Sequence, residues 1–180
     1  MGRRQTIDRG HLLDAAEQVV LRDGPSSLTI DAVAKEAGVS KGGVLYAYST
    51  KDALIEAMMA RVVANYERMV AEYMAAAGDR PNAAVLAHVD ANRREEASEN
   101  ARAIALMASF IRAPEYHASS VAFYRELFAH ADMTTEAGRR IRLALLATEG
   151  AFVLRGFGLH PFSDADWQAI HEDIVAILLA

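Results

Sequence analysis

The chain has 180 residues, 52% of them apolar, and contains no cysteine. It is long enough to bury a sizeable core, and the lack of cysteine excludes disulfides and thiolate metal sites. Its net charge of −5 is uneven, since residues 1–51 hold seven basic and six acidic side chains, whereas residues 52–180 hold twelve and eighteen.

The charge leaves nucleic acid open as a partner. A locally basic tip on an acidic body can still dock on phosphates, because salt limits the reach of charge to ~8 Å; the same tip is also compatible with ordinary surface. The N-terminal sequence has no apolar run after its arginines, which argues against a secretory signal. No stretch of ~18 apolar residues predicts a membrane span. We therefore expect a cytoplasmic protein that does not bind a membrane.

Apolar residues recur at helical spacing and predict an all-α fold of about nine helices. The predicted helices cover residues 6–23, 29–37, 41–47, 51–77, 82–96, 98–112, 115–131, 135–157 and 163 to the C-terminus. Glycine and proline punctuate them: Gly24-Pro25 ends the first, and residues 78–81 end the fourth. Ser163 and Asp166 fit a capping box at the start of the ninth.

The fourth predicted helix contains neither glycine nor proline. We place a domain boundary in it, between an N-terminal three-helix domain of residues 1–51 and a helical bundle of residues 52–180. A continuous helix across a boundary can act as a lever between the two domains.

Residues 29–48, TIDAVAKEAGVSKGGVLYAY, have the pattern of a helix-turn-helix. Ala34 is small where two helices would cross, Gly38 sits in the turn, and Ser40 is placed to cap the second helix. Apolar residues take the positions that would face inward: Val33, Ala37, Val39, Val44 and Ala47. This motif places its second helix in the major groove of DNA. An ordinary helical hairpin in a bundle is the alternative.

The flanks of this motif resemble the TetR family of regulators. LTIDAVAKEAGVSKGGVLYAYSTKDALIEAMM matches that family's helix-turn-helix, and LLDAAEQVVLRDGPSSLTI matches its first helix and the glycine that ends it. The resemblance covers residues 5–60; beyond them it is one of architecture and length. Leu45 and Ala47 stand where many members carry an aromatic residue and a histidine, and Tyr48 stands where Phe is usual. The missing histidine shifts base readout toward Tyr46.

The candidate DNA-binding residues follow from this placement: Thr29, Ser40, Lys41, Gly42, Gly43, Tyr46 and Lys51. Lys51 begins the fourth helix, where its ammonium and free backbone N–H groups can meet a phosphate. A glycine pair inside a helix costs ~1 kcal/mol per residue relative to alanine, and close approach to DNA is a reason to keep it. The alternative for both lysines is a solvated surface side chain.

The eighth predicted helix contains IRLALLATEGAFVL, which is apolar almost all round. Such a helix is buried on every side, so one face can pack in the monomer and the other against a second chain. The resemblance implies a four-helix dimer interface built by the last two helices. The candidate interface residues are Ala144, Ala147, Ala151, Trp167, Ile170, Ile174 and Ile177. A wholly intramolecular helix pair is the alternative.

The middle helices carry aromatic, methionine and polar residues that could line a ligand pocket. The candidates are His88, Asn92, Met107, Phe110, Phe123, Tyr124, Glu149 and Phe152; each of them could equally be core. Glu149 lies in an apolar stretch and needs a partner, which could be a cationic ligand, an arginine such as Arg102, or the other subunit.

No P-loop, dinucleotide fingerprint, nucleophile elbow or metal-ligand spacing stands out in the sequence. We therefore expect no enzyme activity, no cofactor and no metal. The sequence predicts a DNA-binding transcriptional regulator, specifically a repressor that binds a palindromic operator in double-stranded DNA as a homodimer and is released by an unknown small-molecule ligand. A helical interaction module without DNA contact is the remaining alternative.

Overall fold

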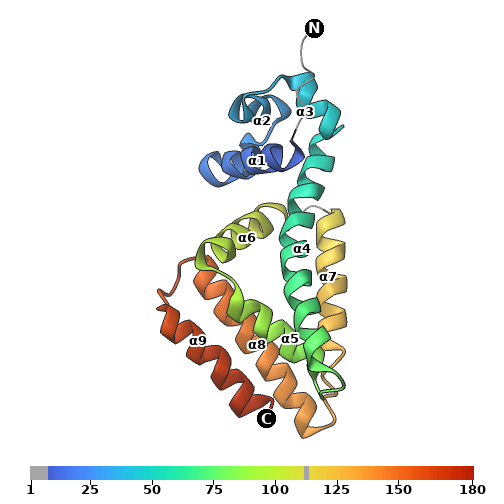
Figure 1. Ribbon diagram of the computed structural model, residues 1–180, viewed down its shortest axis with the longest axis vertical. Helices are drawn as coiled ribbons and strands as arrows, with labels where there is room; N and C mark the ends of the chain where they lie inside the picture. The colour runs from blue at the N-terminus through green and yellow to red at the C-terminus, as the bar shows by residue number, and fades with distance from the viewer. Residues whose placement is uncertain (1–7, 112–113) are drawn as a thin grey trace. The chain divides into compact units, whose positions relative to one another are not determined.

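The computed structural model describes residues 8–111 and 114–180, and over these residues every regular element is helical (Figure 1). This confirms the predicted all-α fold. The elements are α1 (Arg9–Asp23), η1 (Pro25–Ser27), α2 (Ile30–Ala37), α3 (Lys41–Ala47), α4 (Lys51–Ala77), α5 (Ala83–Arg94), α6 (Ala97–Phe110), α7 (Pro114–Phe128), α8 (Glu136–Gly156), α9 (Asp164–Asp173) and the π-helical turn η2 (Ile174–Leu178).

The helix starts follow from side-chain caps. Asp8 accepts from the backbone N–H groups of Gly10 and His11, so α1 begins at Arg9 rather than at residue 6, which lies outside the described residues. Thr135 caps α8, and the predicted capping box of Ser163 and Asp166 is present at α9. Such caps satisfy N–H groups that the first helical turn leaves without partners.

The chain divides into two compact units, and the division falls inside α4. Unit 1 comprises the described residues up to Val62 together with Leu106–Phe110, and unit 2 comprises Val63–Ala105 and Ile111–Ala180. In unit 1, the apolar faces of the first four helices meet in a core of fully buried side chains: Leu12, Leu28, Val33, Val44, Leu54 and Met58.

Unit 2 is organised around α5, which contacts α8, α9 and η2 (Figure 1). One core cluster joins Val85 of α5 to Leu127, Ile141 and Leu145, and a second joins Val89 to Ala144 and Ile174. A side chain at Gly156 would collide with Ile104, so this glycine lets α8 approach α6 closely. No helix in the described part of the chain is long and apolar enough to span a bilayer.

Candidate nucleic-acid interface and candidate ligand site

The turn between α2 and α3 has the geometry that the sequence predicts. Gly38 adopts φ 66° and ψ 29°, the left-handed conformation that glycine accepts at least cost. The Ser40 hydroxyl accepts from the Gly43 N–H at 3.1 Å and so caps α3. Thr29 caps α2 in the same way, accepting from the Ala32 N–H at 3.0 Å. The hydroxyl hydrogens of Ser40 and Thr29 stay available to an outside acceptor.

Helix α3 is attached to unit 1 by one face and exposed on the other. Its Val44 is fully buried, whereas the Tyr46 side chain is 87% exposed. The other predicted DNA-binding residues, Thr29, Ser40, Lys41, Gly42 and Lys51, are exposed, and Gly43 is half-buried. An exposed helix face made of small, basic and aromatic residues can enter a groove of DNA while unit 1 stays folded.

Two side chains at this face, Leu45 and Asp31, escaped the sequence prediction. Leu45, treated only as a departure from the family pattern, is 40% exposed beside Tyr46, where an apolar side chain could contact a thymine methyl group. Lys41 donates to Asp31 Oδ2 at 2.7 Å. Both partners are more than half exposed, so the ion pair is worth ~0–1 kcal/mol and can exchange for a phosphate.

Tyr48 belongs to the scaffold rather than to the exposed face. Its side chain is buried, its hydroxyl donates to the Arg9 carbonyl at 3.2 Å, and the Arg9 guanidinium lies 4.5 Å from its ring centroid. These contacts tie the end of α3 to the start of α1. At the start of α4, the Thr50 hydroxyl accepts from the Ala53 N–H at 3.0 Å, which orders the turn that carries Lys51.

The structure places several of the predicted dimer residues inside the single chain. Ala144, Ala151, Trp167 and Ile174 are buried within the single chain, and Ile170 packs against the buried cluster of Val89, Ala144 and Ile174. Trp167 donates from Nε1 to the Arg93 carbonyl at 3.1 Å and stacks under the Arg155 guanidinium. The small and aromatic residues of α8 and α9 therefore form the internal packing with α5, because that face of α8 is already covered.

An unpartnered apolar face remains on α8 in the described structure. Of the predicted interface residues, Ala147 and Ile177 are exposed. They are joined by exposed large side chains that the sequence reasoning passed over: Leu143, Leu146, Leu154 and Phe157. Leu146, Ala147, Leu154 and the capping residue Phe157 follow Leu143 by three, four, eleven and fourteen residues, which keeps them on one side of the helix.

Four polar side chains of unit 2 form a connected network. Tyr124 of α7 donates to Glu149 Oε2 at 2.8 Å, His88 Nε2 of α5 lies 3.0 Å from Glu149 Oε1, and the Tyr66 hydroxyl of α4 lies 2.9 Å from His88 Nδ1. Tyr66 can donate to Nδ1, which leaves the Nε2–H on the side of Glu149, where the pair is close but does not have the geometry of a hydrogen bond. The partners of Glu149 are thus a histidine and a tyrosine of its own chain.

Burial and the nearby Glu149 carboxylate both raise the pKa of Tyr66 and of Tyr124 above the ordinary value of a tyrosine. Both hydroxyls therefore remain hydrogen-bond donors at any physiological pH. Phe123 is 38% exposed and packs edge-on against both tyrosine rings, with centroids 5.5 and 5.1 Å apart. The result is an acidic group surrounded by aromatic rings.

The predicted ligand residues are only partly brought together. His88, Phe123, Tyr124 and Glu149 meet through Tyr66, which the sequence prediction omitted because its partner lies on another helix. Asn92 donates to the His88 carbonyl of its own helix at 2.9 Å, and Phe152 is half-buried. Met107 and Phe110 belong to unit 1. Among the residues that the structure describes, no group of three acidic or histidine side chains could hold a metal ion.

Comparison with known proteins adds a second line of evidence. Residues 12–58 match the model described as bacterial regulatory proteins, tetR family, and residues 82–179 match the model of the tetracyclin repressor-like C-terminal domain. The HTH-type transcriptional regulator BetI of Stenotrophomonas maltophilia is 34% identical over 88 residues, which are 49% of this chain and 45% of that protein. BetI of Burkholderia thailandensis is 37% identical over 92 residues, 51% and 47% of the two chains. The chain thus spans about half the length of these relatives.

Solved structures agree on the fold. A TetR-like transcriptional regulator from Rhodococcus sp. RHA1 superposes with a TM-score of 0.71 at 17% identity, covering 97% of both chains. The multidrug binding protein EbrR, complexed with malachite green, gives a TM-score of 0.68 at 19% identity over 96% of this chain and 99% of that one. At these identities the likeness establishes the fold alone.

Proposed function

Because this chain belongs to the TetR family of DNA-binding transcriptional regulators, we propose that it is a repressor that binds a palindromic operator as a homodimer and leaves it when a small molecule binds in unit 2. The observation that carries the DNA half is the exposed face of α3, with Tyr46 87% exposed on a helix anchored through buried Val44. Both family models describe regulators, which agrees with the expectation of no enzyme activity.

In this proposal the α3 residues read bases and the helix starts hold phosphates. Tyr46 and Leu45 would lie against base edges in the major groove, and Gly42 and Gly43 would let the backbone come close. Lys51, at the first position of α4, would neutralise a phosphate beside the backbone N–H groups of that helix. Thr29 and Ser40 would add their hydroxyl hydrogens to phosphate oxygens.

The exposed face of α8 supports the homodimer. Leu143 and Leu146 are about half exposed, and Phe157 is 52% exposed at the end of the same helix. A contiguous apolar stripe of this kind favours a partner surface, and a two-fold axis through α8 would pair it with its own copy. A two-fold dimer matches a palindrome whose half-sites lie ~34 Å apart.

The network of Tyr66, His88, Tyr124 and Glu149 supports the ligand half. An acidic group among aromatic rings suits an organic cation, which gains from both the carboxylate and the ring faces. The fold relative EbrR is described in complex with malachite green, so this dye is the first probe. Ligand binding would act on DNA through α4, which runs through both units without interruption, with a coupling of ~1–3 kcal/mol.

The test is a gel-shift titration of the full chain on palindromic DNA from beside its own gene, with and without malachite green. We expect a single shifted protein–DNA complex that dissociates when the dye is added. The variant Glu149→Gln should still shift the DNA but should no longer respond to the dye. A shift of the same strength on shuffled DNA would contradict the operator proposal. A shift that the dye leaves unchanged would contradict the proposed ligand class.

A further inference from the structure

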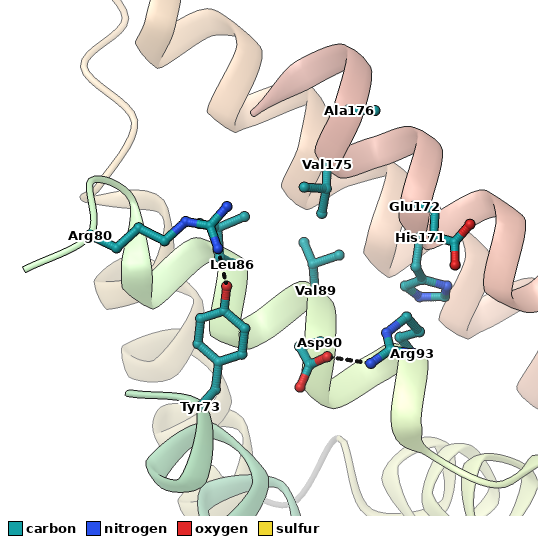
Figure 2. Close-up of a pocket in the computed structure, with 10 residues that line it drawn as sticks. All are labelled: Tyr73, Arg80, Leu86, Val89, Asp90, Arg93, His171, Glu172, Val175 and Ala176. Atoms are coloured by element: carbon teal, nitrogen blue, oxygen red, sulfur yellow. Dashed lines mark hydrogen bonds and ion pairs between the residues drawn. The ribbon is translucent and has the colours of Figure 1, made fainter. Parts of the chain in front are cut away.

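Unit 2 has an open cavity of about 290 Å³ between the end of α4, helix α5 and α9 (Figure 2). Several of its polar groups pair with one another, since Arg93 donates to Asp90 at 2.7 Å and Arg80 donates to the Tyr73 hydroxyl at 3.4 Å. An unfilled recognition surface lies instead on the exposed face of α3 in unit 1, where the Tyr46 side chain is 87% exposed.

This face of α3 lacks the side chains that identify bases through paired hydrogen bonds. In the major groove, arginine reads guanine, and asparagine or glutamine reads adenine, because each can form two hydrogen bonds with one base edge. Helix α3 is described throughout and has the sequence KGGVLYA, which contains none of these residue types. It also contains no aspartate or glutamate to accept from cytosine. Sequence readout by α3 therefore needs another kind of contact.

The polar groups that α3 does offer carry little information about the base pair. Lys41 is a point charge that pairs with Asp31 at 2.7 Å, and lysine also binds phosphates. The Ser40 hydroxyl accepts from the Gly43 N–H at 3.1 Å and has one hydrogen left to donate. Tyr46 adds a single hydroxyl. Single donors of this kind do not distinguish the four base pairs, because every base pair has an acceptor in the major groove.

The exposed face of α3 also has an apolar notch, formed by Gly42, Leu45 and Tyr46. A methyl group built on Gly42 would meet nothing closer than Ser40 Oγ at 3.9 Å, so the space above this backbone is open. Leu45 and Tyr46 follow Gly42 by three and four residues, and helical side chains lean toward the N-terminus, so both flank the opening. Leu45 is 40% exposed, whereas Val44 beside it is fully buried. The notch therefore suits a methyl group better than a hydrogen-bonding edge.

We propose that each operator half-site contains a thymine whose 5-methyl group fills this notch, and that Leu45 is the residue that selects it. Thymine presents a methyl group in the major groove and the other three bases do not, so this contact distinguishes a T·A pair at that position. Gly42 lets the base edge come close to the backbone. The inference rests on the proposed operator binding and adds the base that α3 reads.

Deoxyuridine tests the proposal, because it differs from thymidine by the 5-methyl group alone. Sites that the full chain selects from a random library are synthesised with each thymine replaced singly by deoxyuridine, and fluorescence anisotropy measures the affinities. We expect one position in each half-site at which loss of the methyl group weakens binding about fourfold. The variant Leu45→Ala should bind the thymine and deoxyuridine forms of that site equally.

Cytosine at the same position provides the reverse test. The wild type should bind a site with 5-methylcytosine there about fourfold more tightly than the same site with cytosine, since the two differ by one methyl group in the same place. Leu45→Ala should bind both forms equally. A wild type that does not distinguish the two forms would contradict a methyl-binding notch.

Leu21→Ala is the matched control, because Leu21 is 42% exposed on α1 of the same unit and lies outside the helix-turn-helix. It should keep the wild-type preference for thymine over deoxyuridine. Each preference is a ratio measured within one variant, so a general loss of stability, which thermal melts reveal, does not change it.

The outcomes separate this inference from the proposed function. Selected sites at which no deoxyuridine substitution weakens binding, or a thymine preference that Leu45→Ala retains, would overturn the role of Leu45 while leaving operator binding intact. Selection that yields no common sequence would overturn both.

Discussion

Individual side chains on α3 and at the start of α4 differ in the part of a DNA duplex that they can contact. Lys51 is a point charge at a helix start, whereas Tyr46 presents a planar ring 87% exposed to solvent. A phosphate contact carries no sequence information, and a base contact does. Truncation of the two side chains should therefore have different effects on the affinity for operator DNA and for random DNA.

We predict that Lys51→Ala weakens binding to operator and random DNA alike and reduces the salt slope of log K by ~1. Tyr46→Ala should cost ~1–3 kcal/mol on the operator and little on random DNA. Fluorescence anisotropy at several salt concentrations measures both effects, with Arg125→Ala as a matched surface control. Identical losses for the two variants on both DNAs would contradict the assigned roles.

Glu95, at the end of α5, gives a pH-dependent contribution to stability. Burial raises its pKa from 4.5 to about 7, with Glu99 adding to the rise and a hydrogen bond to Asn100 and the charges of Arg155 and Arg102 opposing it. Since the folded-state pKa is the higher one, the stabilisation is fully present below pH 4.5 and is lost as the pH rises through about 7.

We predict that Glu95→Gln removes this dependence. Between pH 4.5 and pH 8, the free energy of unfolding of the variant should rise relative to that of the wild type by ~2 kcal/mol. Denaturant midpoints of both proteins across this range measure the difference. A constant offset between the two curves would show that Glu95 does not change its protonation in this window.

At the scale of elements, local chemistry determines where the helices begin. Tertiary packing determines which side of each helix is buried, so that side could not be predicted from the sequence. Caps such as Thr29, Ser40 and Ser163 act on backbone groups within three residues, so the starts of their helices follow from the sequence. The orientation of α8 does not, because it is apolar all round and α5 decides which side is covered. Ala144 and Ala151 therefore turned inward, and Leu146 remained outside.

The candidate sites divide along the same line. The residues that we propose to face DNA lie within one local motif, so the spacing in the sequence was enough to nominate them. The network around Glu149 joins residues on four helices. Tyr66 and His88 are 22 positions apart in the sequence, and Tyr124 and Glu149 are 25 apart, so only tertiary packing brings these side chains together. Tyr66 was missed for this reason.

Helix α3 offers a test that separates stability from DNA binding. Gly42 is exposed and helical, and a methyl group there would meet nothing closer than Ser40 Oγ at 3.9 Å. We predict that Gly42→Ala stabilises the protein by ~1 kcal/mol and yet weakens operator binding about tenfold, equal to ~1.4 kcal/mol. Thermal melts and anisotropy measure the two effects. An alanine variant that binds DNA as well as the wild type would show that the α3 backbone does not approach the duplex.

Helix α8 allows a similar separation of folding from assembly. Leu146 is 53% exposed, so Leu146→Glu should leave the single chain folded while placing two like charges near the two-fold axis. We predict a monomer by analytical ultracentrifugation with an unchanged helical circular dichroism spectrum. Val121→Glu, at an exposed site on α7, should remain dimeric. A dimeric Leu146→Glu would exclude this face of α8 as the interface.

At the scale of the whole molecule, the regulator consists of two compact units that share the uninterrupted helix α4. Unit 1 presents the exposed face of α3, which we propose reads DNA, and unit 2 holds buried polar groups and an apolar outer face. Because α4 belongs to both units, a change in its orientation on ligand binding would change the positions of Lys51 and α3. The α4 route therefore predicts that ligand and operator lower each other's affinity by the same factor.

The most direct measurement of the central claim is selection of DNA from a random library by the full chain, followed by footprinting of the selected sites. We predict an inverted repeat whose half-sites are centred about one helical turn, ~34 Å, apart, bound by two chains and protected in the major groove. Selection that yields no common sequence, or a single half-site bound by one chain, would contradict it.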